Sequence, residues 1–390
     1  GRDRRRFRIM RSRVRIGMAG YSGIGRVHAL GYRALPLIYP GSVPTPVLQR
    51  VCTSRRESAE AARGEAGFLE AGTSLEELVA AQDVDMIDLT LPNHLHLPLV
   101  KAALASGKPV YCEKPLAGTI EDARAIARMV NDASLPFGIV FQYRFFPAIQ
   151  RAKELVDSQA IGRVYTFRAE YLHTGYQDPD RPLSWRMKKE EGGSGALGDL
   201  GSHVIDLVRY LVGEFESVQG HLETFIHERP VEKGSKEKGA VTVDDVAWLQ
   251  ARMHGGAVGS IEASRLATGT LDDLRIWIYG ERGALHFNLM DPAFLYYYDE
   301  QRPKGSYGGR RGWQRLETVQ NYPGAAAPPP RAPIGWERAH AESQYRFIRA
   351  IEAGEEPSPG IHDGLKTQLV LDAAERSVAA DGAWTTVAQQ

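Results

Sequence analysis

The chain has 390 residues, of which 43% are hydrophobic and 25% are charged, a composition typical of a globular protein. The length exceeds what one hydrophobic core usually organises, so we expect two domains. Lysine plus arginine and aspartate plus glutamate each number 48, and this balance argues against a general affinity for nucleic acid or acidic surfaces.

Arginine is concentrated in the opening stretch GRDRRRFRIMRSRVR. We expect residues 1–12 to form a disordered basic leader, with an arm that contacts DNA as the alternative. No apolar run approaches the roughly 18 residues that a membrane-spanning helix needs. The only cysteines, Cys52 and Cys112, lie in predicted strands, which favours a reduced, cytoplasmic setting over a disulfide framework.

The first third of the chain alternates apolar strands with helical patterns. Strands are predicted over 14–19, 47–53, 86–91, 109–113 and 137–144, and helices over 26–35, from 57, from 75, over 96–106 and over 119–131. Ser74 and Glu77 have the spacing of a capping box at the start of one helix. Continuous apolar strands separated by helices indicate a doubly wound parallel sheet, so we predict an α/β Rossmann domain over 13–144.

The rhythm changes after residue 147. A helix over 148–158 precedes alternating strands over 163–173, 218–226, 243–253, 257–267, 273–280 and 284–290, and two helices over 337–352 and 363–380 close the chain. Two polar stretches, 228–240 and 303–335, are expected to be loops, the second a lid or subunit contact because of its length. We therefore predict an α+β domain over 145–390 with a large open, mainly antiparallel sheet.

A glycine-rich turn, GYSGIG, joins the first predicted strand to the first predicted helix. Glycines there let the backbone turn sharply and approach a pyrophosphate, which would rest on the amino terminus of the helix. Ser22 stands where the usual motif has its middle glycine, and it still offers a backbone amide and a hydroxyl. The predicted contacts are Gly20, Ser22, Gly23, Ile24 and Gly25.

The end of the second strand bears on the choice between NAD and NADP. A carboxylate there would bind the ribose 2′-hydroxyl, but the chain reads Cys52-Thr53-Ser54-Arg55-Arg56. The two arginines could accommodate a 2′-phosphate, or they could simply be the solvated start of a helix. Thr53, Ser54 and Arg55 are predicted cofactor contacts, and the cofactor remains NAD or NADP.

Three further motifs carry the predicted chemistry. Pro92, Asn93 and His96 follow the strand over 86–91, and Glu113-Lys114-Pro115 follows the next strand. Ligands bind beyond the carboxyl ends of such strands, so Pro92, Asn93, His96, Glu113 and Lys114 are predicted cofactor contacts, with Lys114 directed at the nicotinamide. Later in the chain, Asp199 and His203 are four residues apart and hence on one face of a helix.

These side chains suit the oxidation of an alcohol, which needs a hydride acceptor and a group that removes the hydroxyl proton. A histidine suits that task near neutral pH, and a lysine beside the same oxygen would stabilise a developing alkoxide or relay the proton. We expect the ammonium of Lys114 and the imidazole of His203 to act above the same nicotinamide ring. Which of them is the immediate base stays open.

In these motifs the chain resembles the glucose–fructose oxidoreductase, inositol dehydrogenase and MocA (Gfo/Idh/MocA) family. The likeness runs through GIGRVHA, PNHLHLPL, CEKPLA and GGSGALGDLGSHVIDL. It implies that Lys114, Asp199 and His203 are catalytic and that the Lys114–Pro115 peptide is cis, which would fix the direction of the lysine. It also implies that the second domain binds the substrate and that its sheet forms the interface of a homo-oligomer, a dimer or tetramer.

A narrower likeness, in PLSWR, TFIHERP and GAVGSIEASR, is to family members that oxidise the 3-hydroxyl of a pyranose. Those members favour NAD although they also lack the ribose acid. The likeness implies that a sugar pocket is lined by Lys114, Tyr143, Arg144, His173, Trp185, Arg186, Asp199 and His203. For Tyr143 and Trp185 core packing is the alternative, and for His173 a plain strand position.

Other classes of function are disfavoured by the sequence. The pairs His94/His96 and Asp199/His203 have metal-ligand spacing, but no third convergent ligand accompanies either, so no metal is predicted. There is no G-x-S-x-G elbow of a serine hydrolase. The expected activity is NAD(P)-dependent oxidation of a secondary hydroxyl of a sugar, anhydrosugar or cyclitol. The alternatives are a cofactor-retaining glycosidase or epimerase, and a nonenzymatic dinucleotide sensor.

Overall fold

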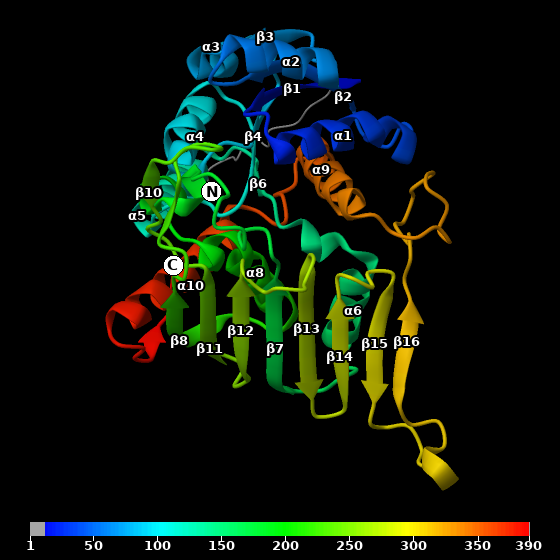
Figure 1. Ribbon diagram of the computed structural model, residues 1–390. Helices are drawn as coiled ribbons and strands as arrows, with labels where there is room; N and C mark the ends of the chain where they lie inside the picture. The colour runs from blue at the N-terminus through cyan, green and yellow to red at the C-terminus, as the bar shows by residue number, and fades with distance from the viewer. Residues whose placement is uncertain (1–11, 390) are drawn as a thin grey trace. The chain divides into compact units, whose positions relative to one another are not determined.

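The computed structural model describes residues 12–389, which divide into two compact units (Figure 1). The predicted leader therefore lies outside the described residues, apart from Ser12. The first unit contains the chain up to Gln142 together with Tyr322–Pro330 and Gly335–Leu365. The second contains Tyr143–Asn321, Arg331–Ile334 and the chain from Lys366. The chain first passes from one unit to the other after Gln142, two residues before the predicted boundary at 144.

The sheet of the first unit is parallel throughout, as predicted. Its strands are β1 (Arg13–Ala19), β2 (Thr45–Cys52), β3 (Glu70–Gly72), β4 (Met86–Leu89), β5 (Val110–Cys112) and β6 (Phe137–Ile139). Their order is β3-β2-β1-β4-β5-β6, so the direction of winding reverses between β1 and β4. Consecutive residues 16–19 of β1 are all buried because helices cover both faces of the sheet. A dinucleotide binds beyond the carboxyl ends of strands at such a reversal.

The helices of the first unit begin within one residue of the predicted positions, except α1, which begins three residues before the predicted start at 26. They are α1 (Gly23–Ile38), α2 (Arg56–Ala66), α3 (Leu75–Ala80), α4 (His96–Ala105), α5 (Ile120–Ala133) and α9 (Trp336–Ala353), with a 3₁₀ turn η1 (Asn93–Leu95) before α4. The side chain of Ser74 accepts a hydrogen bond from the backbone of Glu77 at 3.1 Å, which confirms the predicted cap of α3. The three-residue strand β3 was not predicted.

Helix α9 lies in the first unit, whereas the predicted boundary placed all of 145–390 in the second. The helix packs on α1: Gln344 donates to the backbone carbonyl of His28 at 2.9 Å, and the rings of Tyr345 and Tyr39 stack 3.7 Å apart. The approach is so close that a Cβ on Gly31 would collide with Gln344. The apolar period of α9 reveals a buried face but not which sheet that face covers.

The second unit contains a nine-stranded sheet in the order β16-β15-β14-β13-β7-β12-β11-β8-β17. Its strands are β7 (Val164–Leu172), β8 (Phe215–Glu223), β11 (Val246–Met253), β12 (Val258–Ser264), β13 (Asp273–Gly280), β14 (Gly283–Asn288), β15 (Phe294–Asp299), β16 (Trp313–Glu317) and β17 (Thr385–Thr386). Every neighbouring pair is antiparallel except β7 and β12. The prediction of a mainly antiparallel sheet is confirmed.

Helices cover one face of this sheet, and the other face is open. The helical segments are α6 (Pro147–Asp157), α7 (Lys189–Gly192), α8 (Ser202–Leu211), the short turns η2 (Gln142–Phe145), η3 (Trp185–Met187), η4 (Leu197–Gly201) and η5 (Ser306–Gly308), and α10 (Ile361–Ala379), whose first turn belongs to the first unit. Helix α6 contacts β14 and β15, and α8 contacts β7. No helix within residues 12–389 is both long and apolar enough to cross a bilayer.

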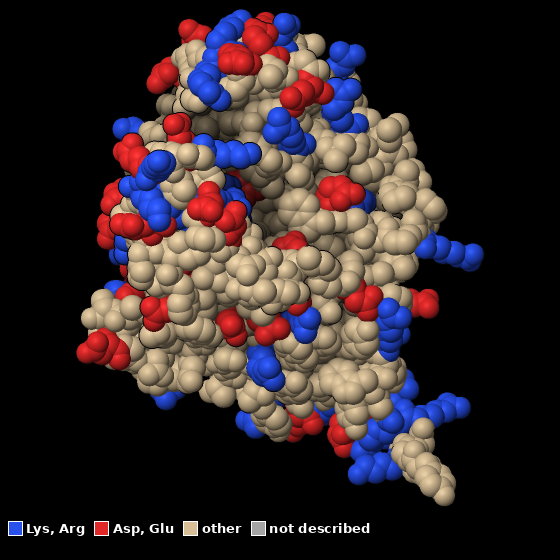
Figure 2. Space-filling view, in the orientation of Figure 1, with Lys and Arg blue, Asp and Glu red and all other residues tan. Residues whose placement is uncertain are grey.

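Two predicted loops contain strands. A small hairpin, β9 (Glu228–Pro230) with β10 (Lys238–Ala240), occupies the charged stretch 228–240. Strand β16 lies in the Pro/Gly-rich stretch 303–335, where its edge position and pairing with β15 organise a short polar run that has little strand propensity. The prediction of a loop was therefore wrong for 313–317. Figure 2 shows basic and acidic side chains interspersed on the face it draws, in keeping with zero net charge.

Candidate active site

The glycine-rich turn between β1 and α1, residues 20–25, contains three glycines, and we call it the glycine cradle. Gly20 has φ of +92°, and a Cβ there would lie 2.9 Å from the carbonyl of Thr90. The hydroxyl of Thr90 donates to the carbonyl of Gly20 at 3.0 Å and so ties the cradle to the end of β4. At Gly23 an added Cβ would meet nothing within 4 Å. An accessible glycine at the first position of a 16-residue helix leaves room for a pyrophosphate, whose contact with this turn stays a prediction.

The end of β2 carries Thr53, Ser54 and Arg55 on the same edge of the sheet as the cradle, because Gly20 donates its backbone N–H to the carbonyl of Cys52 at 2.9 Å. Ser54 and Arg55 are exposed. Arg56 is also exposed, but it pairs with Glu60 at 2.5 Å and donates to the carbonyl of Ala71. Arg55 is therefore the better placed of the two arginines to meet a group on the ribose.

Pro92 and Asn93 open η1 directly after β4, and Asn93 is buried. His96 is completely buried, with its two ring nitrogens 3.1 Å from the carbonyls of Leu116 and Leu91. Burial lowers the pKa of His96, so the ring is neutral and donates to only one of the two carbonyls. The ring thus lies between the loops that contain Leu91 and Leu116. This geometry disfavours the predicted direct contact of His96 with a dinucleotide.

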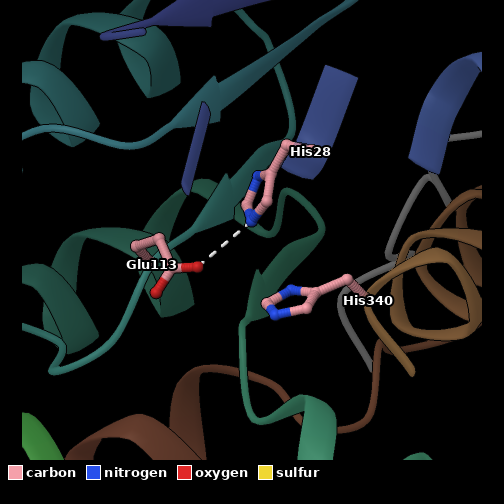
Figure 3. Close-up of side chains that lie close together, drawn as sticks. All are labelled: His28, Glu113 and His340. Carbon is pink, nitrogen blue, oxygen red and sulfur yellow. Dashed lines mark hydrogen bonds and ion pairs between the residues drawn. The ribbon is translucent and has the colours of Figure 1, made fainter. Parts of the chain in front are cut away.

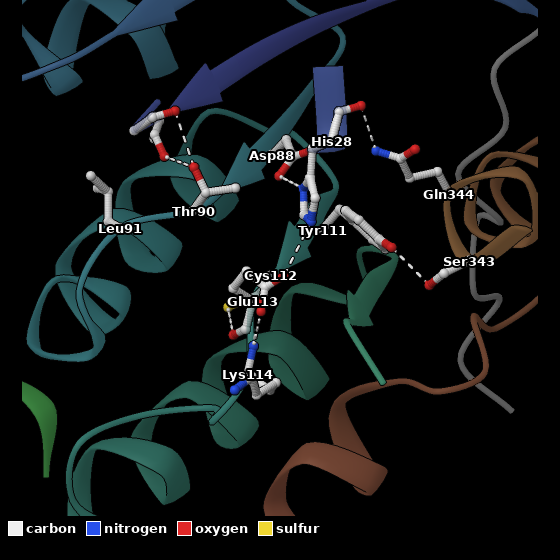
Figure 4. A network of polar contacts seen from close by, with 12 residues as sticks. His28, Asp88, Thr90, Leu91, Tyr111, Cys112, Glu113, Lys114, Ser343 and Gln344 are labelled. Carbon is white, nitrogen blue, oxygen red and sulfur yellow. Dashed lines mark hydrogen bonds and ion pairs between the residues drawn. The ribbon is translucent and has the colours of Figure 1, made fainter. Parts of the chain in front are cut away.

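Glu113 and Lys114 follow β5 in a buried turn. The Lys114–Pro115 peptide is cis, as the family resemblance implied. Glu113 is buried, and one of its carboxylate oxygens accepts the backbone N–H of Lys114 at 3.1 Å. The other oxygen lies 3.1 Å from Nε2 of His28 on α1. Lys114 is only partly buried, so its side chain leaves a well-held main chain (Figure 4).

One group of three potential metal ligands occurs among residues 12–389: His28, Glu113 and His340, whose ligand atoms all lie within 4.8 Å of one another. Neither His94/His96 nor Asp199/His203, the pairs with metal-ligand spacing in the sequence, belongs to this group. A direct hydrogen bond already joins His28 to Glu113, whereas neither ring nitrogen of His340 has a hydrogen-bond partner among the described residues.

In the second unit, Asp199 lies on the π-helical turn η4, directly before α8. Its carboxylate pairs with the guanidinium of Arg265 at 3.1 Å, and Arg265 is 1% exposed. The turn itself is held by Asp244, whose carboxylate accepts the backbone N–H groups of Gly195 and Leu197 at 2.7 and 2.8 Å. Asp199 thus has a fixed direction and keeps a partly exposed side chain.

His203 lies one turn after Asp199, on α8. Its ring makes an edge contact with Tyr143 at a centroid distance of 4.7 Å. The hydroxyl of Tyr143 is 2.7 Å from that of Tyr171, which donates to Asp272 at 2.6 Å. Tyr143 is only 2% exposed, so its contribution is to pack and orient His203.

The other predicted sugar-lining residues differ in how well they are placed. His173 is partly exposed, and its Nδ1 accepts the backbone N–H of Gly175 at 2.9 Å, which leaves the proton on Nε2 available for a ligand. Trp185 and Arg186 are partly exposed, with the guanidinium 4.3 Å from the indole ring. Arg144 is buried and pairs with Asp206 at 2.7 and 2.5 Å, which gives it a structural role beneath α8.

Four residues of this arrangement were not predicted: His28, Asp88, Arg265 and Asp244. The sequence contained a signal for two of them, because His28 lies in the motif GIGRVHA and Asp244 in the VDD run. Their partners are distant along the chain: Arg265 is 66 residues from Asp199, and His28 is 85 residues from Glu113. Only the fold brings these pairs together.

A glycine cradle at the reversal of a parallel sheet, followed by a held lysine, defines the first unit as the dinucleotide-binding domain of an oxidoreductase. Residues 14–141 match the family model described as the oxidoreductase family with an NAD-binding Rossmann fold, and residues 149–286 match the GFO/IDH/MocA C-terminal domain. The chain belongs to the Gfo/Idh/MocA family, and it is an NAD(P)-dependent oxidoreductase.

Individual relatives cover nearly the whole chain. Levoglucosan dehydrogenase of Pseudarthrobacter phenanthrenivorans is 34% identical over 96% of this chain and 98% of its own length. Inositol 2-dehydrogenase of Rhizobium meliloti is 28% identical over 94% and 97%. The solved structure of levoglucosan dehydrogenase in complex with NADH superposes with a TM-score of 0.92, at 35% identity, over 97% of this chain and 100% of that one.

Proposed function

We propose that the protein oxidises a secondary hydroxyl of a sugar, anhydrosugar or cyclitol, with NAD as the preferred cofactor. The proposal rests on two contacts that hold the proposed catalytic residues. Glu113 accepts a hydrogen bond from the main chain of Lys114, and Arg265 pairs with Asp199, which lies one helical turn before His203. Levoglucosan dehydrogenase and inositol 2-dehydrogenase, both similar to this chain over nearly its full length, act on such hydroxyls.

When bound, the nicotinamide accepts a hydride from the carbon that carries the hydroxyl. The chain's own residues bind and orient the alcohol and take up its proton. In the proposed mechanism Lys114 stabilises the developing alkoxide, His203 accepts the hydroxyl proton, and Asp199 orients His203 or binds a second hydroxyl. His173, Trp185 and Arg186 are proposed to line the sugar, since each has a partly exposed polar group or aromatic face.

The proposal of NAD over NADP rests on the end of β2. Arg56 is already paired with Glu60, so of the two arginines only Arg55 is placed to meet a 2′-phosphate. Structures of levoglucosan dehydrogenase contain NADH. Turnover with NAD is therefore expected to exceed turnover with NADP when both are assayed with the same sugar.

The open face of the second unit's sheet supports the proposal of a homo-oligomer. It carries a row of aromatic side chains: Trp277 stacks on His286 at 4.5 Å, His286 is 5.6 Å from Tyr296, and farther along Tyr298 contacts Trp313. Trp248 and Trp313 are 39% and 50% exposed. Such a face is suited to a second copy of the chain, and sedimentation velocity is the measurement that tests it.

The experiment that tests the activity is a panel of levoglucosan, monosaccharides and inositols against NAD and NADP, read as absorbance of the reduced nicotinamide. Lys114→Ala is expected to lower turnover by about 10²-fold or more, the order of loss for one electrostatic or acid–base group. Lys101→Ala, which removes an exposed lysine of the same unit, is the control. Sugar conversion without release of NADH would instead indicate a redox-neutral glycosidase or epimerase.

A further inference from the structure

A buried histidine, His28, joins two carboxylates beneath the cofactor cradle. It lies on α1, three residues after Gly25, and it is 0% exposed. Its Nδ1 is 2.9 and 3.0 Å from the two carboxylate oxygens of Asp88 at the end of β4. Its Nε2 is 3.1 Å from an oxygen of Glu113, just after β5. Figure 4 shows the ring lying between these two acids.

This geometry determines the protonation of the ring. A neutral imidazole has one N–H and one lone pair, so one of its nitrogens would face a carboxylate oxygen with no proton between them. Both contacts are satisfied when His28 is an imidazolium that donates to both acids. Burial alone would lower the pKa of His28, but the charges of Asp88 and Glu113 outweigh it and raise the pKa to about 10. His28 is thus a fixed buried cation.

The chain of contacts continues to the proposed catalytic lysine. The carboxylate oxygen of Glu113 that does not face His28 accepts the backbone N–H of Lys114 at 3.1 Å. Despite burial, which acts in the opposite direction, its hydrogen bond with His28 lowers the pKa of Glu113 and keeps it an acceptor on both oxygens. Asp88 fixes His28, His28 fixes Glu113, and Glu113 fixes the main chain of Lys114.

We infer that His28 is a positioning residue for the reaction, which it serves by holding Glu113 and through it the direction of Lys114. The inference rests on the proposed role of Lys114. His28 touches neither the sugar nor the reacting carbon in this scheme, and it acts through a chain of two hydrogen bonds. A displacement of about 1 Å in a reacting group can reduce a rate by about 10²-fold, so such a support has a measurable effect.

Of the two neighbouring buried histidines, His28 and His340, only His28 carries a positive charge. Asp88 on β4 and Glu113 after β5 face it directly, Tyr111 on β5 and His340 on α9 lie beside its ring, and Tyr32 on α1 interacts with Asp88. His340 is buried with its ring centroid 5.8 Å from that of His28 (Figure 3). Burial, followed by the charge of His28, lowers the pKa of His340 to about 3, so this second ring is neutral.

The first test is His28→Gln, which cannot carry a charge and can donate to only one of the acids. Turnover is expected to fall by about 10- to 100-fold, while the dissociation constant of NADH, measured by fluorescence, and KM for the sugar change little. His362→Gln, an exposed histidine of the same unit, is the control. Normal turnover of His28→Gln beside an inactive Lys114→Ala would overturn the inference and leave the proposed function intact.

The double variant His28→Gln/Lys114→Ala separates positioning from general structural support. If His28 acts only through Lys114, the double variant is as slow as Lys114→Ala alone. A further multiplicative loss would show that His28 acts elsewhere and would overturn the inference. If Lys114→Ala keeps normal turnover, it is the proposed function that fails.

Asp88→Asn provides a second route if His28→Gln does not fold. Loss of one anion lowers the pKa of His28, so the turnover of Asp88→Asn relative to wild type is expected to decline as pH rises and to recover as pH falls. A loss that is the same at every pH would contradict the inference. So would a stoichiometric transition metal in the purified protein, because His28, Glu113 and His340 would then be its ligands rather than a support for Lys114.

Discussion

Replacement of Arg144 by methionine distinguishes a structural arginine from a sugar-binding one. Arg144 and Asp206 form a two-point ion pair with side chains 6% and 1% exposed. Removal of one member of such a pair leaves a buried charge and costs about 3–5 kcal/mol. Arg209, with a nitrogen 3.7 Å from Asp206, compensates part of this loss, so we expect a value near the lower end, about 3 kcal/mol.

For a unit of this size, about 3 kcal/mol corresponds to a fall in melting temperature of roughly 6–12 °C, measurable by calorimetry. The double variant Arg144→Met/Asp206→Leu removes both charges and is expected to regain most of the stability. KM of Arg144→Met for the sugar, measured below its melting temperature, should remain near the wild-type value. An unchanged melting temperature together with a raised KM would refute this reasoning and would indicate that Arg144 binds the sugar.

Three further predictions concern stability. Gly195→Ala would place a Cβ 1.8 Å from the backbone oxygen of Asp244, so we expect the free energy of unfolding to fall by about 1–3 kcal/mol and turnover to fall with it. Gly64→Ala, which adds a Cβ in open space on a helix, should raise the free energy of unfolding by about 0.5–1 kcal/mol. Urea titration measures both changes. Ser74→Ala should cost about 1 kcal/mol in the same assay. The imidazolium of His28 stabilises the fold fully below pH about 6.5 and ceases to do so as pH approaches its pKa of about 10, so the stability difference between wild type and His28→Gln should shrink by up to about 1.4 kcal/mol per pH unit between these values.

Local signals in the sequence were enough to predict most of the fold. The buried strands of the first unit are uninterrupted apolar runs, and the Ser74 cap is a short-range pattern that needs no tertiary partner. Strand β15 was missed although its run FLYYYD favours a strand, but the other misplaced or missed elements depend on distant residues. Strand β16 is a short polar run stabilised by its pairing with β15, and α9 has an apolar face that could have covered either sheet.

The same distinction applies to the candidate site. The glycine cradle and the Glu113-Lys114-Pro115 turn are contiguous motifs, so they could be predicted with the resemblance that they carry. Arg265 and Asp88 could not, because an arginine at a strand end and an aspartate inside an apolar strand have no characteristic local pattern. The resemblance implied that Arg144 lines the sugar, but the sequence does not reveal that the guanidinium of Arg144 pairs with Asp206.

The late position of α9 in the chain affects synthesis on the ribosome. When residue 142 has emerged, the nucleotide-binding sheet is complete, but the apolar surface around Tyr39 and Tyr111 still lacks Tyr345, Phe347 and Ile351. About 200 residues, enough for nearly the whole of the other unit, are translated before those side chains follow. The unit whose translation begins first is therefore completed only after most of the other unit has been made, and a fragment that stops at residue 142 would expose this apolar surface.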